Sequence, residues 1–210
     1  QQPVIQRYLI HRLHGQKNPI KEQVGLMWTT QTNNFQADGG LIMKQNSEMN
    51  LGLKNVWDVV CLDKDGNEKW REINKNLVTT VGLNHVLDSG FDGATQITAW
   101  YVGLKGAGTA AAGDTASSHS GWSDITAYSE SVRQTLNLGS ASSGSINNSS
   151  NKATFSINGS ATVAGAFIVS NSGKTATART LYGVVDFGSS RSVISGDTLQ
   201  VTITLTAASA

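Results

Sequence analysis

The amino-acid sequence predicts a mainly β protein: an antiparallel β-sandwich or jelly-roll with one short helix and an extended N-terminal arm. Three observations support this fold class. The chain has 22 glycines in 210 residues, and only 15% of its residues are charged. Short apolar runs alternate with polar, Gly/Ser-rich linkers, as they do in all-β domains. The sequence shows no long helical pattern that would connect parallel strands, so an α/β fold is not expected.

Residues 1–50 are predicted to form an arm or attachment segment, and residues 51–210 a β-sandwich body. The first 20 residues are basic and contain no acidic residue. Their apolar positions fit a short amphipathic helix, and an extended arm fits nearly as well. In both cases the apolar side must be buried on something, which for a terminal segment is often another subunit. The predicted protein interface consists of Arg7, Tyr8, Leu9, Arg12, Trp28 and Phe35.

The segment 55–74, NVWDVVCLDKDGNEKWREIN, predicts a β-hairpin. Asp65-Gly66 is a turn signal between runs that are rich in Val, Trp and Ile. We expect Trp57 and Trp70 to pair across the two strands. Asp63, Asp65 and Asn67 alternate at the turn, but the glycine and the final glutamate of an EF-hand loop are missing from their required positions. A plain turn, without calcium, is therefore expected.

The segment 74–93 is the best helix candidate in the chain. Asn76 is suited to cap its start, and Gly90 to follow its end. His85 has no second histidine at ligand spacing, so we expect a structural role for it. The apolar stripe of this helix is imperfect and consists of Leu77, Val81, Val86 and Leu87.

The stretch GLKGAGTAAAGDT, residues 103–115, raises the question of nucleotide binding. It follows an apolar run that predicts a strand. Gly108 and Gly113 have the spacing of a phosphate loop, and the stretch also fits the dinucleotide fingerprint. However, Asp114 stands where a phosphate loop has lysine, and no helical pattern follows to cradle the phosphate. We therefore expect a flexible small-residue loop that leaves a strand at the edge of a sheet, and no bound nucleotide.

Five further runs predict strands, and they lie at residues 125–138, 152–159, 161–170, 179–188 and 197–207. The last of these, DTLQVTITLTA, has the clearest pattern, because its apolar and polar residues alternate with the period of a half-buried strand. Its predicted buried face consists of Leu199, Val201, Ile203 and Leu205.

The sequence contains little that predicts chemistry. The net charge of +1 creates no strong field for nucleic acid or a membrane surface. The single cysteine, Cys61, lies in an apolar run, so a buried and inert thiol is expected. No spacing of histidines and carboxylates matches a metal or nucleophile motif. We expect no enzyme activity, no cofactor and no metal, although a serine triad or carboxylates from distant strands would leave no local signature.

Five segments appear in a familiar order: VVCLDKDGNEKWREINKNLVTTVGLNHVLD, YVGLKGAGTAAAGDT, SGWSDITAYSESVRQTLNLG, ATFSINGSATVAGAFIVS and SVISGDTLQVTITLTA. This order resembles small structural proteins of tailed bacteriophages, which decorate or cement the capsid or sit on the tail. The resemblance covers about residues 55–210. It implies a non-enzymatic, oligomeric protein on the capsid surface of the virion, made in the host cytoplasm. Its partners would be the major capsid protein, copies of itself, or both.

Two other functions are compatible with this sequence. One is a tail-fibre or receptor-binding module that recognises a bacterial surface glycan, which predicts exposed aromatic residues near Trp122. Core packing is nevertheless the favoured interpretation of Trp122 itself. The other is a glycan-active enzyme, which would bring two carboxylates together in a cleft. A cement protein would instead contact the capsid through residues 1–50 and stabilise the assembled lattice.

Overall fold

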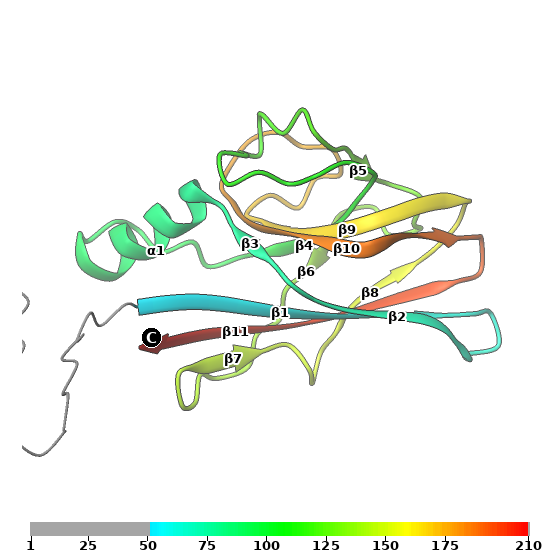
Figure 1. Cartoon of the computed structure of the whole chain (residues 1–210), viewed down its shortest axis with the longest axis horizontal. Helices are drawn as coiled ribbons and strands as arrows, with labels where there is room; N and C mark the ends of the chain where they lie inside the picture. Colours follow the sequence, from blue (N-terminus) through cyan, green and yellow to red (C-terminus); the bar gives the residue numbers. More distant parts are fainter. Residues whose placement is uncertain (1–50, 210) are drawn as a thin grey trace, which may run out of the picture. The chain divides into compact units, whose positions relative to one another are not determined.

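The computed structural model describes residues 51–209, which form two antiparallel sheets and one short helix (Figure 1). The predicted mainly β, antiparallel sandwich is confirmed. The first sheet contains the strands at both ends of the described chain, β1 (Leu51–Leu62) and β11 (Thr198–Ser209), which pair along their whole length. Its other strands are β2 (Glu68–Lys75), β7 (Ser145–Asn147) and β8 (Ala153–Ser156). β2 pairs with β1, whereas β7 and β8 both pair with β11.

The second sheet has the order β3-β10-β9-β4-β5, and β6 also pairs with β4. Its strands are β3 (Leu77–Val78), β4 (Tyr101–Lys105), β5 (Asp124–Ile125), β6 (Gln134–Thr135), β9 (Ala161–Val169) and β10 (Leu181–Val193). Two predictions are wrong here. The run 125–138 is mostly irregular, and β4 is an interior strand, so the glycine-rich loop that follows it does not leave an edge strand.

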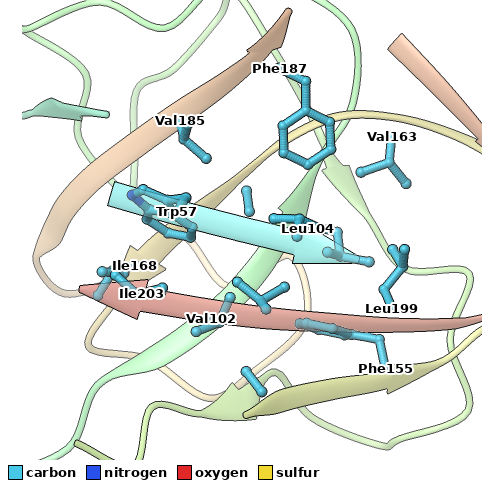
Figure 2. Packing of buried hydrophobic residues seen from close by; sticks show 14 of the residues in the cluster. Trp57, Val102, Leu104, Phe155, Val163, Ile168, Val185, Phe187, Leu199 and Ile203 are labelled. Atoms are coloured by element: carbon cyan, nitrogen blue, oxygen red, sulfur yellow. The ribbon is translucent and has the colours of Figure 1, made fainter. Parts of the chain in front are cut away.

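The core lies between the two sheets (Figure 2). The predicted alternation in β11 is confirmed, because Leu199, Val201 and Ile203 are fully buried while Leu205 is partly buried. Burying one such side chain stabilises the fold by about 1.5–3 kcal/mol. The first sheet also contributes Trp57, and the facing sheet contributes Val102, Leu104, Val163, Ile168, Val185 and Phe187.

The predicted hairpin is confirmed, and its turn contains Gly66 at a φ of 84°, a value that suits glycine. The predicted Trp57–Trp70 pair is wrong. The register places Trp70 opposite Cys61, and it places Trp57 opposite Asn74. Trp57 is buried between the sheets, while Trp70 packs edge-on against Phe187 of β10, with ring centroids 6.1 Å apart.

The helix α1 spans Thr80–Phe91, within the predicted segment. Both predicted ends are wrong. Leu77 and Val78 pair with β10, so the helix starts later, and Thr79 rather than Asn76 caps it by accepting a hydrogen bond from the Gly82 backbone N–H. Gly90 lies inside the last turn. Within residues 51–209, no helix is long and apolar enough to cross a membrane.

Gly82 sets the contact between α1 and the second sheet. A Cβ atom at this position would lie 2.3 Å from the carbonyl oxygen of Tyr182 on β10. The absent side chain therefore lets the helix backbone approach the sheet closely, and this approach decides which faces of α1 are left exposed.

Candidate functional site

The six interface residues predicted from the sequence cannot be placed in the fold. Arg7, Tyr8, Leu9, Arg12, Trp28 and Phe35 all lie outside the described residues, as does the whole predicted arm, residues 1–50.

The glycine-rich loop after β4 uses its polar groups internally. Lys105, the last residue of β4, is fully buried, and its Nζ lies 2.8 Å from Oδ1 of Asp186 on β10. The same ammonium group donates hydrogen bonds to the carbonyl oxygens of Gly106 and Gly108. The other carboxylate oxygen of Asp186 accepts a hydrogen bond from the Ala110 N–H at 3.0 Å. The only lysine in this stretch is therefore neutralised and turned inward.

Asp114 and Trp122 also hold this loop in place. The Asp114 carboxylate accepts hydrogen bonds from the Ala111 N–H at 2.9 Å and from Trp122 Nε1 at 2.8 Å. Trp122 is only 6% exposed and stacks against His119 at a centroid distance of 4.0 Å. The core interpretation of Trp122 is confirmed, and this ring is not the exposed aromatic that a receptor-binding module would need. No helix follows this loop, whereas a phosphate-binding loop leads into the N-terminus of a helix, whose N–H groups bind the phosphate. The loop therefore has the structure of a loop held by its own polar contacts.

Three further ion pairs hold polar groups inside the fold. Arg133 pairs with Asp124, Lys69 with Asp197, and Arg191 with Glu72. Burial opposes ionisation of Glu72, but hydrogen bonds from Asn74, Arg191 and the Gly188 N–H together lower the pKa of this carboxyl below 4.5. These charges have structural partners and are not gathered at a reaction centre.

Cys61 is fully buried, as the sequence predicted. Burial raises the pKa of its thiol to about 11, and the charge of Asp197 contributes to the same shift. The thiolate is the reactive form, so this cysteine is suited to packing and not to nucleophilic chemistry at neutral pH. Within the described part of the chain, no group of three or more metal-ligating side chains is present.

The outer face of α1 carries an unusual feature that the sequence pattern did not reveal. Leu83, Leu87 and Phe91 follow one another at intervals of four residues, so they lie along one side of the helix. Their exposed fractions rise along the helix from 39% to 51% and 83%. We call these three residues the apolar stripe. The predicted apolar side is correct for Val81 and Val86, which are partly buried, and wrong for Leu87, which belongs to the exposed stripe. Leu77 lies in β3 and not in the helix.

A hollow of about 270 Å³ lies beside another face of α1. Trp100 contacts both His85 and Tyr182 edge-on, with ring centroids 5.7 Å apart in each pair. Burial raises the pKa of Tyr182, so its phenol is neutral in the fold. No carboxylate lines the hollow, whose remaining wall residues are Val86, Ser89, Gln96, Ile97, Leu136, Leu138, Ile168 and Leu205. Its lining is suited to contact with apolar groups and contains no pair of carboxylates for glycan hydrolysis.

Comparison with known proteins adds no family to this description. No family model matches the chain, and no curated protein matches it.

Proposed function

We propose that the protein is a non-enzymatic structural component of a tailed-bacteriophage virion, of the type that decorates or cements the capsid. The observation that carries this proposal is the apolar stripe of Leu83, Leu87 and Phe91 on α1. Exposed apolar side chains that lie together on one face are candidates for a contact surface, whereas singly scattered ones need no explanation. The stripe supports a protein whose work is contact with other subunits, namely the major capsid protein, copies of itself, or both.

Burial of the stripe supplies the driving force for docking. A large apolar side chain contributes about 1.5–3 kcal/mol when it passes from full exposure to full burial. Phe91 would therefore contribute most, and the half-buried Leu83 and Leu87 less. A protein that binds the assembled lattice better than free subunits shifts the equilibrium toward the intact shell. The internal ion pairs support this role, because they hold the loops of the β body in fixed positions and leave a rigid element to lie against its neighbours.

The test uses the phage that encodes the chain, with Phe91→Ser and Leu87→Ser introduced together. We expect the variant protein to be depleted from purified particles and the particles to release their genome at a lower temperature. Ile73→Ser is the matched control, because Ile73 is 62% exposed on β2 and lies outside α1. Thermal unfolding of the isolated proteins checks that each variant is folded. Normal incorporation of the double variant, or absence of the wild-type chain from particles, would contradict the proposal.

A further inference from the structure

A second surface, which we call the polar groove, lies at the start of β4 and has no part in the proposed docking through α1. It has a volume of about 600 Å³. Two stretches of chain that are far apart in the sequence form its sides: the connection from α1 to β4, and the connection from β9 to β10. Its lining consists of Thr95, Gln96, Ile97, Thr98, Ala99, Tyr101, Ser170, Asn171, Ser172, Arg179 and Thr180.

The polar side chains of this groove are largely without partners inside the protein. Within residues 51–209, no hydrogen bond or ion pair engages the guanidinium of Arg179. The same holds for the side chains of Thr95, Gln96 and Thr98 on the opposite stretch. One cation and a set of hydroxyl and amide groups therefore line one groove, and their side chains are exposed to solvent, where a ligand would replace water as their hydrogen-bond partner.

Arg179 is held in a backbone conformation that a non-glycine residue rarely adopts. Its φ is 86°, which costs of the order of 1–3 kcal/mol for such a residue. Hydrogen bonds on both sides maintain it. The Asn171 amide donates to the carbonyl of Ala178. Three hydrogen bonds join Ser170 and Thr180, two of 3.0 Å and one of 3.4 Å. Strain of this kind persists where the surroundings impose it, and it concentrates at binding sites.

A buried ion pair fixes the rest of the same loop. Arg133 is 3% exposed and donates hydrogen bonds to the carbonyls of Asn171, at 3.0 Å, and Ala176, at 3.3 Å. Its partner Asp124 accepts a hydrogen bond from the Thr175 N–H at 3.1 Å. The loop is thus ordered before any ligand arrives, and a preorganised site loses less conformational entropy on binding. The Asp124 carboxylate is also neutralised, so it does not oppose an anion near Arg179.

We propose that the polar groove binds an acidic saccharide, meaning a sugar unit that bears a carboxylate or a phosphate. Arg179 supplies the planar donor pair that recognises either anion with two hydrogen bonds. Thr95, Thr98 and the Gln96 amide supply partners for sugar hydroxyls. The lining contains no carboxylate and no histidine, so the groove lacks the groups for acid–base chemistry or for holding a metal ion. This inference goes beyond the proposed structural role, because it gives the particle a means of adhering to an acidic surface polysaccharide.

The test is an NMR titration of the full, isotope-labelled chain. The probes are trimers of galacturonate, glucuronate and mannuronate, glucose 1-phosphate, neutral maltotriose, and inorganic phosphate. We expect at least one acidic sugar to shift the amide signals of residues 95–101 and 170–180, and maltotriose to bind about tenfold more weakly or not at all. Comparing the uronate trimers with glucose 1-phosphate shows whether the groove recognises a sugar carboxylate or a sugar phosphate.

Two variants assign the effect to the groove. Arg179→Asn removes the guanidinium but keeps a residue that tolerates a positive φ, and it should weaken acidic-sugar binding about tenfold. Thr98→Val, which keeps the side-chain shape, should weaken it by a smaller factor. Lys64→Asn removes a cation from the β1–β2 turn and should change nothing. The proposal fails if no acidic sugar binds, if maltotriose binds equally well, if Arg179→Asn binds normally, or if inorganic phosphate alone binds as tightly.

Discussion

The two ends of strand β4 carry polar loops of opposite character. At its C-terminal end, Lys105 and the loop that follows are engaged by Asp186, Asp114 and backbone carbonyls. At its N-terminal end, Thr95, Thr98 and the facing Arg179 have no partner within residues 51–209. The first loop has the glycine spacing of a phosphate loop, and its polar groups are paired within the fold. The second carried no motif and is the candidate binding site.

The difference shows that polar composition alone does not indicate a site. A polar group that is already paired inside the fold has little to gain from a ligand, because binding would first have to break the existing contact. A group that is held in place but paired only with water exchanges that contact for one with the ligand. Asp186→Asn and Arg179→Gly test this contrast between the two ends of β4, and Glu72→Gln tests a paired carboxylate on β2. They follow in order of decreasing expected effect on stability.

Asp186→Asn should have the largest effect, because it leaves the buried Lys105 ammonium without its counter-charge. We expect a loss of about 3 kcal/mol in the free energy of unfolding, measured by urea denaturation. The double variant Lys105→Met with Asp186→Leu, which removes both charges, should recover part of that loss. An Asp186→Asn variant as stable as the wild type would show that the Lys105–Asp186 pair does not stabilise the C-terminal end of β4.

Acidification should weaken the fold through paired carboxylates, of which Glu72 is one. Because folding lowers its pKa, the ionised form stabilises the native state at pH values above about 4.5, and this contribution is lost as the pH falls through the lower folded-state pKa. Glu72→Gln should therefore be less stable than the wild type at neutral pH. It should also lose less stability than the wild type below pH 4.5, measured by urea unfolding at a series of pH values. Parallel pH profiles of the two proteins would contradict this.

Arg179→Gly should have the smallest effect and the opposite sign. Glycine adopts a φ of 86° without strain, although it loses more backbone entropy on folding. We expect a net gain of about 0.5 kcal/mol in unfolding free energy, measured by denaturation, together with loss of acidic-sugar binding. Ser143 also has a positive φ but lies outside the groove, so Ser143→Gly serves as the control that gains stability without affecting binding. A destabilised Arg179→Gly variant would mean that the guanidinium supports the fold.

Local signals were sufficient for much of the body and failed where distant segments decide the geometry. The hairpin at Asp65-Gly66 could be predicted because a turn and its flanking strands are adjacent in the chain. The start of α1 could not be predicted, because Leu77 and Val78 form a strand by pairing with β10, about a hundred residues later in the chain. The side chain of Leu87 was placed on the wrong side of α1 for a similar reason, since the close approach at Gly82 determines which side of the helix meets the sheet.

The sequence by itself determined that this chain builds antiparallel strands around an apolar core. The alternation of Leu199, Val201 and Ile203 is a property of the local pleat, which places every second side chain on one face. Only the tertiary structure decided which polar side chains have hydrogen-bond or ion-pair partners inside the fold and which remain free to bind a ligand. The burial of Lys105 against Asp186 depends on β4 and β10 both flanking β9, and the polar groove depends on residues 95–101 meeting residues 170–180. Such contacts between distant segments depend on the order of strands in the sheet, which no short stretch of sequence encodes.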